Sequence, residues 1–293
     1  MDTSQKLNQI PSATNIIALC RLNRPTGIWL LLAPCLWSLS LANDGFPSIW
    51  YILLFTIGSV LMRSAGCVYN DIVDRNLDKY VERTKSRPLA CADVSVIQAW
   101  GIIALLSLTS CIILLQFPTT TIALGIGALA LVATYPWMKR ITYWPQAFLG
   151  LTFNWGALMG WSAVKNQIEP PALWLYAAGI TWTLIYDTIY AHQDKQDDIL
   201  VGIKSTALKL GPRTKPFIFC CATTMIICLG IAVWDAGIGI NRYVVPGFLF
   251  IAAHLFWQCW TVDLYDPEDC LAKFKANQWL GLLILVIILI GRY

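Results

Sequence analysis

Polar and charged residues gather at two places where an apolar stretch of this chain ends. The first group has members separated by seven, four and four residues: Arg63, Asn70, Asp74 and Asp78. On one continuous helix, which turns by 100° per residue, these side chains share a face about 80° wide, with Asp71 at its edge. The spacing therefore predicts a row of carboxylates that begins at an arginine deep in an apolar segment.

The second group repeats part of this spacing. Its aspartates are separated by seven and four residues, at Asp187, Asp194 and Asp198. Each group is followed by a basic loop, and the two lie about 120 residues apart. This similarity suggests a weak pseudo-repeat, in which both groups face one cavity.

Carboxylates that lie close together repel one another, and a cation that joins them keeps them ionised. Oxygen ligands suit Mg²⁺, which binds through one or two carboxylates together with the phosphates of a substrate. The two groups therefore predict two Mg²⁺ sites that hold a diphosphate. Basic side chains would complete the anion site: Arg63, Lys79, Arg83, Arg87, Lys139, Arg140 and Lys204.

Each of these basic residues has a second interpretation. A long basic side chain can reach the membrane interface and serve only the topology of the protein. Likewise, the carboxylates could be solvated charges on a loop. Arg63 fits the topological role least, because it lies at membrane depth, where a charge is costly unless it is paired or functional.

The elements that must position these groups are apolar helices. The chain has 293 residues, of which 57% are hydrophobic and 13% charged, whereas soluble domains carry about 25% charged residues. About 20 apolar residues span a bilayer as a helix, and runs of this length exclude barrel strands. Nine spans are predicted, near residues 24–43, 48–70, 94–115, 120–137, 144–163, 172–190, 216–235, 243–262 and 276–291.

The predicted fold is therefore an all-α, multi-pass transmembrane bundle of about nine helices. No linker or shift in composition divides the chain, so residues 1–293 are expected to form a single domain. The ten cysteines form no CxxC pair. We interpret them as small apolar residues of helices and not as a metal or disulfide framework.

The distribution of Lys and Arg predicts the orientation. With the N-terminus in the cytoplasm, 17 of the 21 basic residues fall on the cytoplasmic side, as the positive-inside rule requires. The net charge of +4 is then a signature of topology and does not indicate nucleic-acid binding. Both aspartate groups lie on this side, so a cytoplasmic-side polar cavity is expected. The first 20 residues make a poor signal or transit peptide, which favours a bacterial inner membrane.

At these residues the sequence resembles the UbiA superfamily of intramembrane aromatic prenyltransferases, and most closely its 4-hydroxybenzoate branch. Four blocks carry the resemblance in order, at residues 21–27, 63–89, 135–156 and 186–206. The two aspartate motifs indicate the superfamily. The Gly202-to-Thr206 loop and the block from Tyr135 to Arg140 favour the branch.

The resemblance implies a role for each matching residue. One Mg²⁺ would be held by Asn70, Asp74 and Asp78, with Asp71 beside them. Asp194 and Asp198 would hold the other, oriented by Asp187. Contacts to the diphosphate would come from Arg63, Lys139 and Arg140, and shielding of positive charge from Tyr135 and Tyr190.

The implied substrates are a polyprenyl diphosphate and 4-hydroxybenzoate, joined in ubiquinone biosynthesis. Diphosphate leaves an allylic carbon, and the ring carbon ortho to the hydroxyl attacks it. We expect Arg21 or Arg24 to bind the acceptor carboxylate, and the prenyl tail to leave sideways between helices into the bilayer. The sequence predicts neither the length of that tail nor the oligomeric state.

Three alternatives remain open. A proton-coupled transporter would also carry intramembrane carboxylates, but carriers place them near the midplane in broken helices. An intramembrane aspartyl protease would need a GxGD sequence, which this chain lacks. A prenyltransferase of another branch would act on homogentisate, a naphthoate or haem.

Overall fold

A computed structural model describes residues 11–292, and this part of the chain is helical throughout, without strands. Two 3-10 turns, η1 (Asp78–Tyr80) and η2 (Gly211–Arg213), separate some of the helices. In chain order the helices are α2 (Ala13–Leu19), α3 (Thr26–Ala42), α4 (Ile49–Asp74), α5 (Val96–Leu114), α6 (Thr119–Ile141), α7 (Pro145–Asn154), α8 (Gly156–Lys165), α9 (Pro170–Ala191), α10 (Lys195–Val201), α11 (Thr206–Leu210), α12 (Thr214–Asp235), α13 (Val244–Thr261) and α14 (Pro267–Ile290).

Six segments of the described chain are long and apolar enough to cross a membrane. They contain α4, α5, α6, α12, α13 and α14, and each matches a predicted span. Of the other three predicted spans, α3 is apolar but has 17 residues, and α9 has 22 residues without reaching the same hydropathy. The third, predicted at 144–163, is not one helix, because it divides into α7 and α8 at Trp155.

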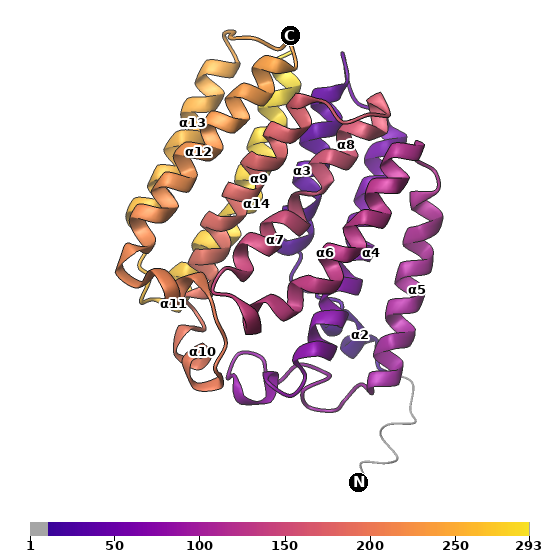
Figure 1. Ribbon diagram of the computed structural model, residues 1–293, viewed down its shortest axis with the longest axis vertical. Coiled ribbons are helices and arrows are strands. Elements are labelled where there is room, and N and C mark those ends of the chain that lie inside the picture. Colours follow the sequence, from indigo (N-terminus) through magenta and orange to yellow (C-terminus); the bar gives the residue numbers. More distant parts are fainter. Residues whose placement is uncertain (1–10, 293) are drawn as a thin grey trace.

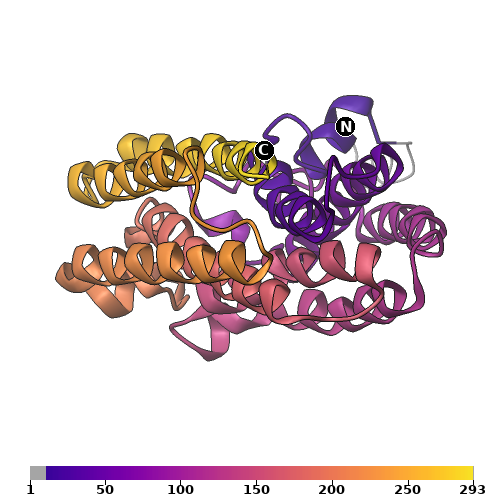
Figure 2. The same ribbon diagram turned by 90° about the horizontal axis from the view of Figure 1, so that it is seen from above.

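The long helices run side by side, and the short ones gather at one end (Figure 1). That end holds α2, α10, α11 and the loop between α4 and α5, whereas the C-terminus lies at the opposite end. Seen from above, the helices form one bundle with α5 at its periphery (Figure 2). The loops that carry both aspartate groups therefore meet at the same end of the bundle.

Local sequence explains where several of these helices begin. Ser95 caps α5 in a reciprocal capping box with Gln98, which satisfies two backbone donors of the first turn. Asp266 caps α14, and Pro267 follows at its first position, where a missing N–H costs nothing. All ten cysteines are free, and eight of them lie in helices, whereas Cys20 and Cys91 lie in turns.

The largest buried cluster spans α3, α7, α8, α9, α12, α13 and α14, and two tryptophans lie within it where α3, α9 and α14 meet. Trp37 and Trp182 are fully buried with ring centroids 5.0 Å apart. Each indole N–H has a partner: Trp37 Nε1 donates to Gly281 O at 2.7 Å, and Trp182 Nε1 donates to Asn277 Oδ1 at 2.8 Å. Satisfied donors let two large aromatic residues lie in an apolar interior without the penalty of an unpaired polar group.

Close packing of α3 on α8 depends on glycine. A Cβ placed on Gly160 would lie 2.4 Å from Cys35 O and 3.0 Å from Leu39 N. These are backbone atoms, which cannot move aside as a flexible side chain would. The two helices can therefore approach this closely only because residue 160 has no side chain, as is common where membrane helices meet.

We predict that Gly160→Ala lowers the thermal unfolding midpoint of the detergent-solubilised protein by several degrees. The added methyl group forces α3 and α8 apart, and such overpacking costs about 1–3 kcal/mol. Gly101→Ala is the matched control, because Gly101 lies in exposed α5 with no atom within 4 Å of an added Cβ. An equal midpoint for both variants would contradict this account of the α3–α8 contact.

Candidate active site

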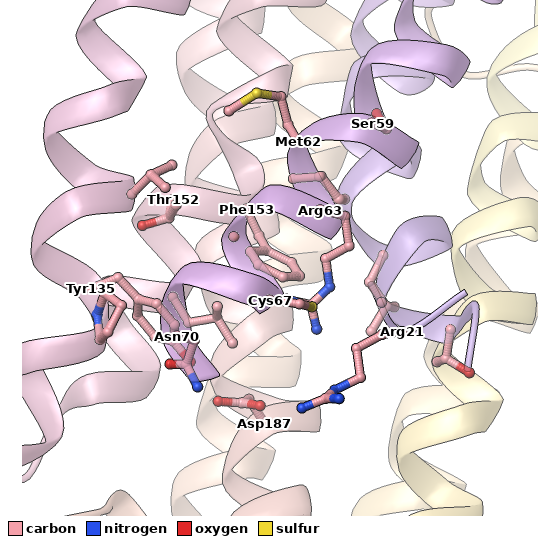
Figure 3. Close-up of a pocket in the computed structure, with 18 of the residues that line it drawn as sticks. Arg21, Ser59, Met62, Arg63, Cys67, Asn70, Tyr135, Thr152, Phe153 and Asp187 are labelled. Carbon is pink, nitrogen blue, oxygen red and sulfur yellow. The ribbon is translucent and has the colours of Figure 1, made fainter. Parts of the chain in front are cut away.

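One large cavity, of about 1230 Å³, opens at the charged end of the bundle and continues between the helices. Residues of both aspartate groups line it, among them Asn70, Asp78, Asp187, Asp194 and Asp198. Figure 3 shows Arg63, Arg21, Asn70 and Asp187 directed toward the same open space. The expectation that both groups face one cavity is therefore correct.

The first group does not lie on one continuous helix. α4 ends at Asp74, where Leu77 N bonds to Asp74 O at 2.8 Å, and the chain then turns into η1. The predicted face is thus helical only as far as Asp74, and Asp78 reaches the cavity from a turn. The turn is fixed from the loop side, because Arg87 binds the Asp78 carboxylate and Thr84 Oγ1 donates to Asp78 O.

The second group is interrupted in the same way. α9 ends at Ala191, and Asp194 sits in the N-cap position of the separate helix α10, which contains Asp198. The predicted 7-then-4 spacing on one face is therefore wrong as helix geometry. Even so, the bend brings Asp187, Asp194 and Asp198 to a single cavity wall.

Asp71 is a buried anchor between three segments. Its side chain is 1% exposed, and Arg21 Nη2 donates to both carboxylate oxygens at 2.8 Å. Arg87 Nη1 donates to Asp71 Oδ1 at 3.1 Å and to Asp78 Oδ2 at 2.8 Å. This Arg21–Asp71–Arg87–Asp78 network ties the end of α2 and the basic loop to α4.

The backbone of Arg21 reflects this task. Its φ is 56°, in the left-handed region that residues other than glycine rarely adopt. The side chain turns back from there, so that Nη1 donates to Ala18 O at 2.9 Å while Nη2 holds Asp71. The two contacts of the guanidinium compensate for the backbone conformation.

Asp74 lies behind the cavity wall. It is fully buried and does not line the cavity, and Lys139 Nζ donates to its Oδ2. Arg140 Nη2 donates to Asp74 Oδ1 at 3.4 Å and to Val73 O at 2.8 Å. Lys139 itself lines the cavity, so the carboxylate of Asp74 reaches that space only through a basic neighbour.

Arg83 connects the two aspartate groups. Its Nε and Nη2 donate to the two carboxylate oxygens of Asp194 at 2.8 and 2.5 Å, a two-pronged pairing that fixes both planes. Nη1 donates to the Tyr190 hydroxyl at 3.1 Å, and the guanidinium stands 5.4 Å from the centre of that ring. A residue of the first loop thus binds the second motif directly.

The cavity wall at α10 suits a divalent cation. Burial and the neighbouring Asp194 carboxylate raise the pKa of Asp198 to about 7. Two carboxylates one helical turn apart repel each other, and a bound cation would relieve that repulsion. Asp78 and Asn70 also line the cavity and carry further oxygen atoms. The donor set, carboxylates and an amide, is the kind that Mg²⁺ prefers.

In the described part of the chain, no three His, Cys, Asp or Glu side chains lie close enough to hold a metal by themselves. Four of the candidate carboxylates, Asp71, Asp74, Asp78 and Asp194, each bind a guanidinium or ammonium group instead. The basic residues that were expected to hold a diphosphate therefore neutralise the carboxylates that were expected to hold the metal.

Arg63 and Asp187 also line the cavity but take no part in these ion pairs. In the described part of the chain, neither side chain has a hydrogen bond or an ion pair; the same is true of Arg24 and Lys275 at the rim, and Asp198 has no ion pair either. The Arg63 guanidinium lies 5.0 Å from the centre of the Phe153 ring. Gly27 makes room for it, because a Cβ there would lie 2.6 Å from Arg63 Nε. Arg63 and Asp187 are available to a ligand without breaking an existing contact.

The remaining predicted residues divide into two sets. Arg24, Tyr135, Tyr190 and Lys204 line the cavity. Lys79 does not, because it lies on the exposed side of η1 while Asp78 faces inward. Arg140 also lies outside the lining, where it supports the end of α4.

Sequence reasoning missed several residues of the wall. The Arg63 guanidinium stacks over the Phe153 ring, and Phe274 of α14 packs on Tyr190 with ring centroids 4.5 Å apart. Gln146 accepts a bond from Thr206 N at 3.1 Å and so holds the second loop against α7. Phe153 lies within one of the blocks that carry the family resemblance. Nothing in the sequence around Phe274 distinguishes this cavity residue from aromatic residues that face lipid.

Comparison with known proteins agrees with this arrangement. The family described as "UbiA prenyltransferase family" matches this chain over residues 31–283, which is most of its length. The chain belongs to the UbiA prenyltransferase family. A Caenorhabditis elegans protein named "4-hydroxybenzoate polyprenyltransferase, mitochondrial" is 46% identical over 96% of this chain and 83% of its own length. Proteins of the same name from Homo sapiens and Arabidopsis thaliana are 48% and 46% identical, each over 94% of this chain and over 75% and 68% of their own lengths.

Solved structures of UbiA homologues share the fold. One from Aeropyrum pernix K1, without ligand, gives a TM-score of 0.70 at 23% identity and covers 90% of this chain and 96% of that one. Another, from Archaeoglobus fulgidus with GPP and Mg²⁺ bound, gives 0.69 at 15% identity, covering 94% and 99%. The predicted all-helical, multi-pass membrane fold of this family is thus confirmed.

The expected location needs a correction. The relatives named above are called mitochondrial, so they do not support a bacterial inner membrane. The inference from the first 20 residues was weak, because a poor targeting signal is not evidence for any one membrane. Residues 1–10, including Lys6, lie outside the described residues.

We predict that Asp71→Asn destabilises the protein strongly, because it leaves the Arg21 and Arg87 guanidinium groups without their shared carboxylate. Removal of one partner of a buried ion pair costs about 3–5 kcal/mol. The double variant Arg21→Gln with Asp71→Asn should lose less stability than the two single variants lose in sum, because the two residues are energetically coupled. Thermal unfolding of the purified protein measures each loss.

The control for this cycle is Glu82→Gln. Glu82 pairs with Lys85, but both side chains are more than half exposed, and such surface pairs contribute about 1 kcal/mol or less. If the losses of stability caused by Arg21→Gln and Asp71→Asn were additive, the network would not be the anchor described above.

Proposed function

We propose that this chain transfers a polyprenyl group from a polyprenyl diphosphate to the ring carbon ortho to the hydroxyl of 4-hydroxybenzoate. Diphosphate is released, and the product is an intermediate of ubiquinone biosynthesis. The observation that carries the proposal is the 46–48% identity, over at least 94% of the chain, to proteins named for this reaction. The cavity supports it, because a charged end and an apolar interior suit a donor with a diphosphate head and a hydrocarbon tail.

We further propose Mg²⁺ as the cofactor, held by Asn70, Asp78, Asp194 and Asp198. Asp74 would reach the cation only after Lys139 moves away from it, since the two are paired. When bound, Mg²⁺ neutralises charge on the diphosphate and so improves the leaving group. A structure of an Archaeoglobus fulgidus homologue with GPP and Mg²⁺ is consistent with this choice of metal.

The basic residues at the mouth bind the departing diphosphate. Lys139, Arg83 and Arg87 are paired with the carboxylates, and they would be available to phosphate oxygens if those carboxylates held Mg²⁺ instead. Lys204 is held nearby, because its backbone N–H donates to Lys139 O at 2.8 Å and its Nζ donates to Ile141 O at 3.0 Å. Fixed positive groups in a water-poor cavity stabilise the charge that develops on a leaving group.

The rest of the reaction falls to residues deeper in the cavity. As the allylic carbon–oxygen bond breaks, the aromatic face of Tyr135 shields the positive carbon, an attraction of roughly 0.5–2 kcal/mol. Tyr190 is less suited, because Arg83 occupies its face. The acceptor ring carbon then forms the new carbon–carbon bond, and its proton passes to Asp187, a carboxylate without an ion pair.

Arg63 is our candidate for the acceptor carboxylate, in place of Arg21 or Arg24. Arg21 is engaged with Asp71, and Arg24 lies on the exposed rim. Arg63 is unpaired and lies about 10 Å deeper than Asn70 along α4, with Phe153 beneath it to contact an aromatic ring. The sequence pattern had indicated a diphosphate contact for Arg63, but in this proposal the basic residues at the mouth bind the diphosphate.

We also propose that the charged end and the N-terminus face the side that the positive-inside rule assigns to the cytoplasm. The basic loops and the cavity mouth share this end. A water-soluble acceptor would then enter from the aqueous phase, while the donor and the product stay in the bilayer.

We predict that the purified chain, given Mg²⁺, geranyl diphosphate and radiolabelled 4-hydroxybenzoate, forms a lipid-extractable product, and that EDTA abolishes the reaction. Asp194→Asn and Asp198→Asn should each lower kcat by about 10²-fold or more, because each removes a charged ligand of the proposed cation, whose charge stabilises the departing diphosphate. Asp197→Asn is the matched control: Asp197 is adjacent to Asp198 but does not line the cavity.

Two outcomes would overturn parts of this proposal. Product formation that survives EDTA would refute the metal assignment. Turnover with homogentisate but not with 4-hydroxybenzoate would place the chain in another branch of the family.

We predict that Arg63→Leu raises the KM for 4-hydroxybenzoate by about 10- to 100-fold, the range expected for the loss of a charged hydrogen bond, with little change in the KM for the donor. Arg24→Leu serves as the control at the rim of the same cavity. Steady-state kinetics with each substrate varied in turn provides the measurement. A rise confined to the KM of the donor would show that Arg63 contacts the diphosphate and not the acceptor.

A further inference from the structure

A second cavity lies at the end of the bundle opposite the charged loops. Its volume is about 460 Å³, and its walls come from the α3–α4 connection, the α12–α13 connection and the residues that follow α14. Figure 1 shows the C-terminus at this end. The second cavity shares no lining residue with the candidate active site, so it is a separate feature of the fold.

Two arginines line this second cavity, although basic residues are scarce on its side of the protein. The predicted topology places 17 of the 21 Lys and Arg residues on the other side, yet Arg242 and Arg292 come together here. Among the described residues of the lining, only Asp44 carries a carboxylate. Two guanidinium groups therefore face one carboxylate, and this excess of positive charge favours an anionic ligand.

Arg292 is held in place but keeps donors that have no strong acceptor. Its side chain is 14% exposed, and its Nη2 donates to Leu41 O. Its Nη1 lies 3.7 Å from Asp44 Oδ1, but the Asp44 side chain is 97% exposed, and such an exposed pair contributes little. Its Nε is buried and has no hydrogen-bond partner in the described part of the chain. Because a buried donor without an acceptor is unfavourable, this guanidinium would gain from an anion in the cavity.

Arg242 supplies the second guanidinium, and among the described residues it has no ion pair. It is exposed and stands 4.7 Å from the centre of the Tyr243 ring. The neighbouring Asn241 fixes this connection: its Oδ1 accepts from Tyr243 N and Val244 N at 2.9 Å, and its Nδ2 donates to Gly291 O at 2.5 Å. The α12–α13 connection is thereby tied to the end of α14, which brings the two arginines to one cavity.

The second cavity lies where three membrane-spanning segments end. α12 ends at Asp235, α13 begins at Val244 and α14 ends at Ile290, and all three belong to segments long and apolar enough to cross a bilayer. Trp234 and Trp50 lie at helix ends on this side and are more than half exposed, as is typical of aromatic residues at a membrane–water interface. Lipid headgroups flank the hydrocarbon core at the same level, so the cavity faces the layer that contains their phosphates.

We propose that this cavity binds the phosphate group of an anionic phospholipid, with Arg242 and Arg292 as its partners. Guanidinium groups bind phosphate oxygens through paired N–H donors, and basic pockets at the ends of membrane helices suit anionic headgroups. A choline headgroup would bring a further positive charge to the two arginines. Val245 and Leu249, one turn apart on α13, are exposed and offer an apolar surface to the acyl chains. This site does not depend on the proposed prenyl transfer.

The first experiment titrates lipids into the delipidated full chain in a neutral detergent. Dioleoyl phosphatidylglycerol should raise the thermal unfolding midpoint in a saturable way, because a ligand of the folded state stabilises it. Dioleoyl phosphatidylcholine should raise the midpoint less at equal concentration. Glycerol 3-phosphate, which has the phosphate but no acyl chains, should leave it unchanged. Equal effects of the two lipids would overturn the proposal, and an equal effect of glycerol 3-phosphate would assign the cavity to a soluble anion instead.

Matched variants show whether the effect arises at this cavity. Arg242→Gln should raise the apparent Kd for phosphatidylglycerol by about tenfold or more, the loss expected for a charged hydrogen bond. Arg242 is preferred to Arg292, whose removal also breaks the contact with Leu41 O. Lys165→Gln is the control, because Lys165 is an exposed basic residue on the same side but outside the lining, and its Kd should stay within about twofold of the unmodified chain. An unchanged Kd in Arg242→Gln would overturn the proposal.

A second experiment needs no variant, and it decides the matter if Arg242→Gln does not fold. A phosphatidylglycerol analogue with a photoreactive diazirine on its headgroup is bound to the unmodified protein and irradiated. Peptides that contain residues 236–243 or 291–292 should carry the label. Excess unlabelled phosphatidylglycerol should remove the label, whereas excess phosphatidylcholine should not. Label confined to the basic loops at the other end of the bundle would overturn the proposal, because those loops also attract anionic lipids.

Discussion

The neutralisation of buried carboxylates by arginine and lysine is the constraint on which the rest of this structure depends. Asp71, Asp74, Asp78 and Asp194 lie where water is scarce, and each of them binds a basic side chain. An isolated charge in such surroundings is so costly that it would be neutralised or would not be retained. Because of these ion pairs, the basic loops pack against the ends of α4 and α9 and close the bundle at one end. The same pairing keeps the site ordered before any substrate binds.

The pairing also gives the site its chemical logic. A metal diphosphate carries both signs of charge, so it could exchange with the internal pairs without leaving either partner alone. Under the proposed function, the carboxylates would serve as ligands of the metal, and the ammonium and guanidinium groups would contact phosphate oxygens. Arg63 and Asp187 belong to none of these pairs, and we propose that they serve the acceptor instead of the leaving group.

Much of the fold could be predicted from apolar runs, because a bilayer leaves the backbone few alternatives to a helix. Each predicted span corresponds to helical structure, and the family was evident from four ordered blocks. The break at Trp155 was not predicted, since a uniformly apolar sequence does not reveal where neighbouring helices meet. The bends after Asp74 and Ala191 were missed for another reason: helical periodicity was extended into loops whose path is set by Arg87 and Arg83. These partners lie 9 to 111 residues away in the chain, and spacing within one segment contains no information about them.

The order of the ion pairs along the chain has a consequence for biosynthesis. Arg21 precedes Asp71 by 50 residues, so this carboxylate has a partner already made when α4 leaves the ribosome. Lys139 follows Asp74 by 65 residues, and Asp194 follows Arg83 by 111. Asp74 and Arg83 must therefore wait, close to the lipid headgroups, until later helices have been inserted. A nascent chain stopped between residues 87 and 139 would hold the first anchor but leave Asp74 and Arg83 without their partners.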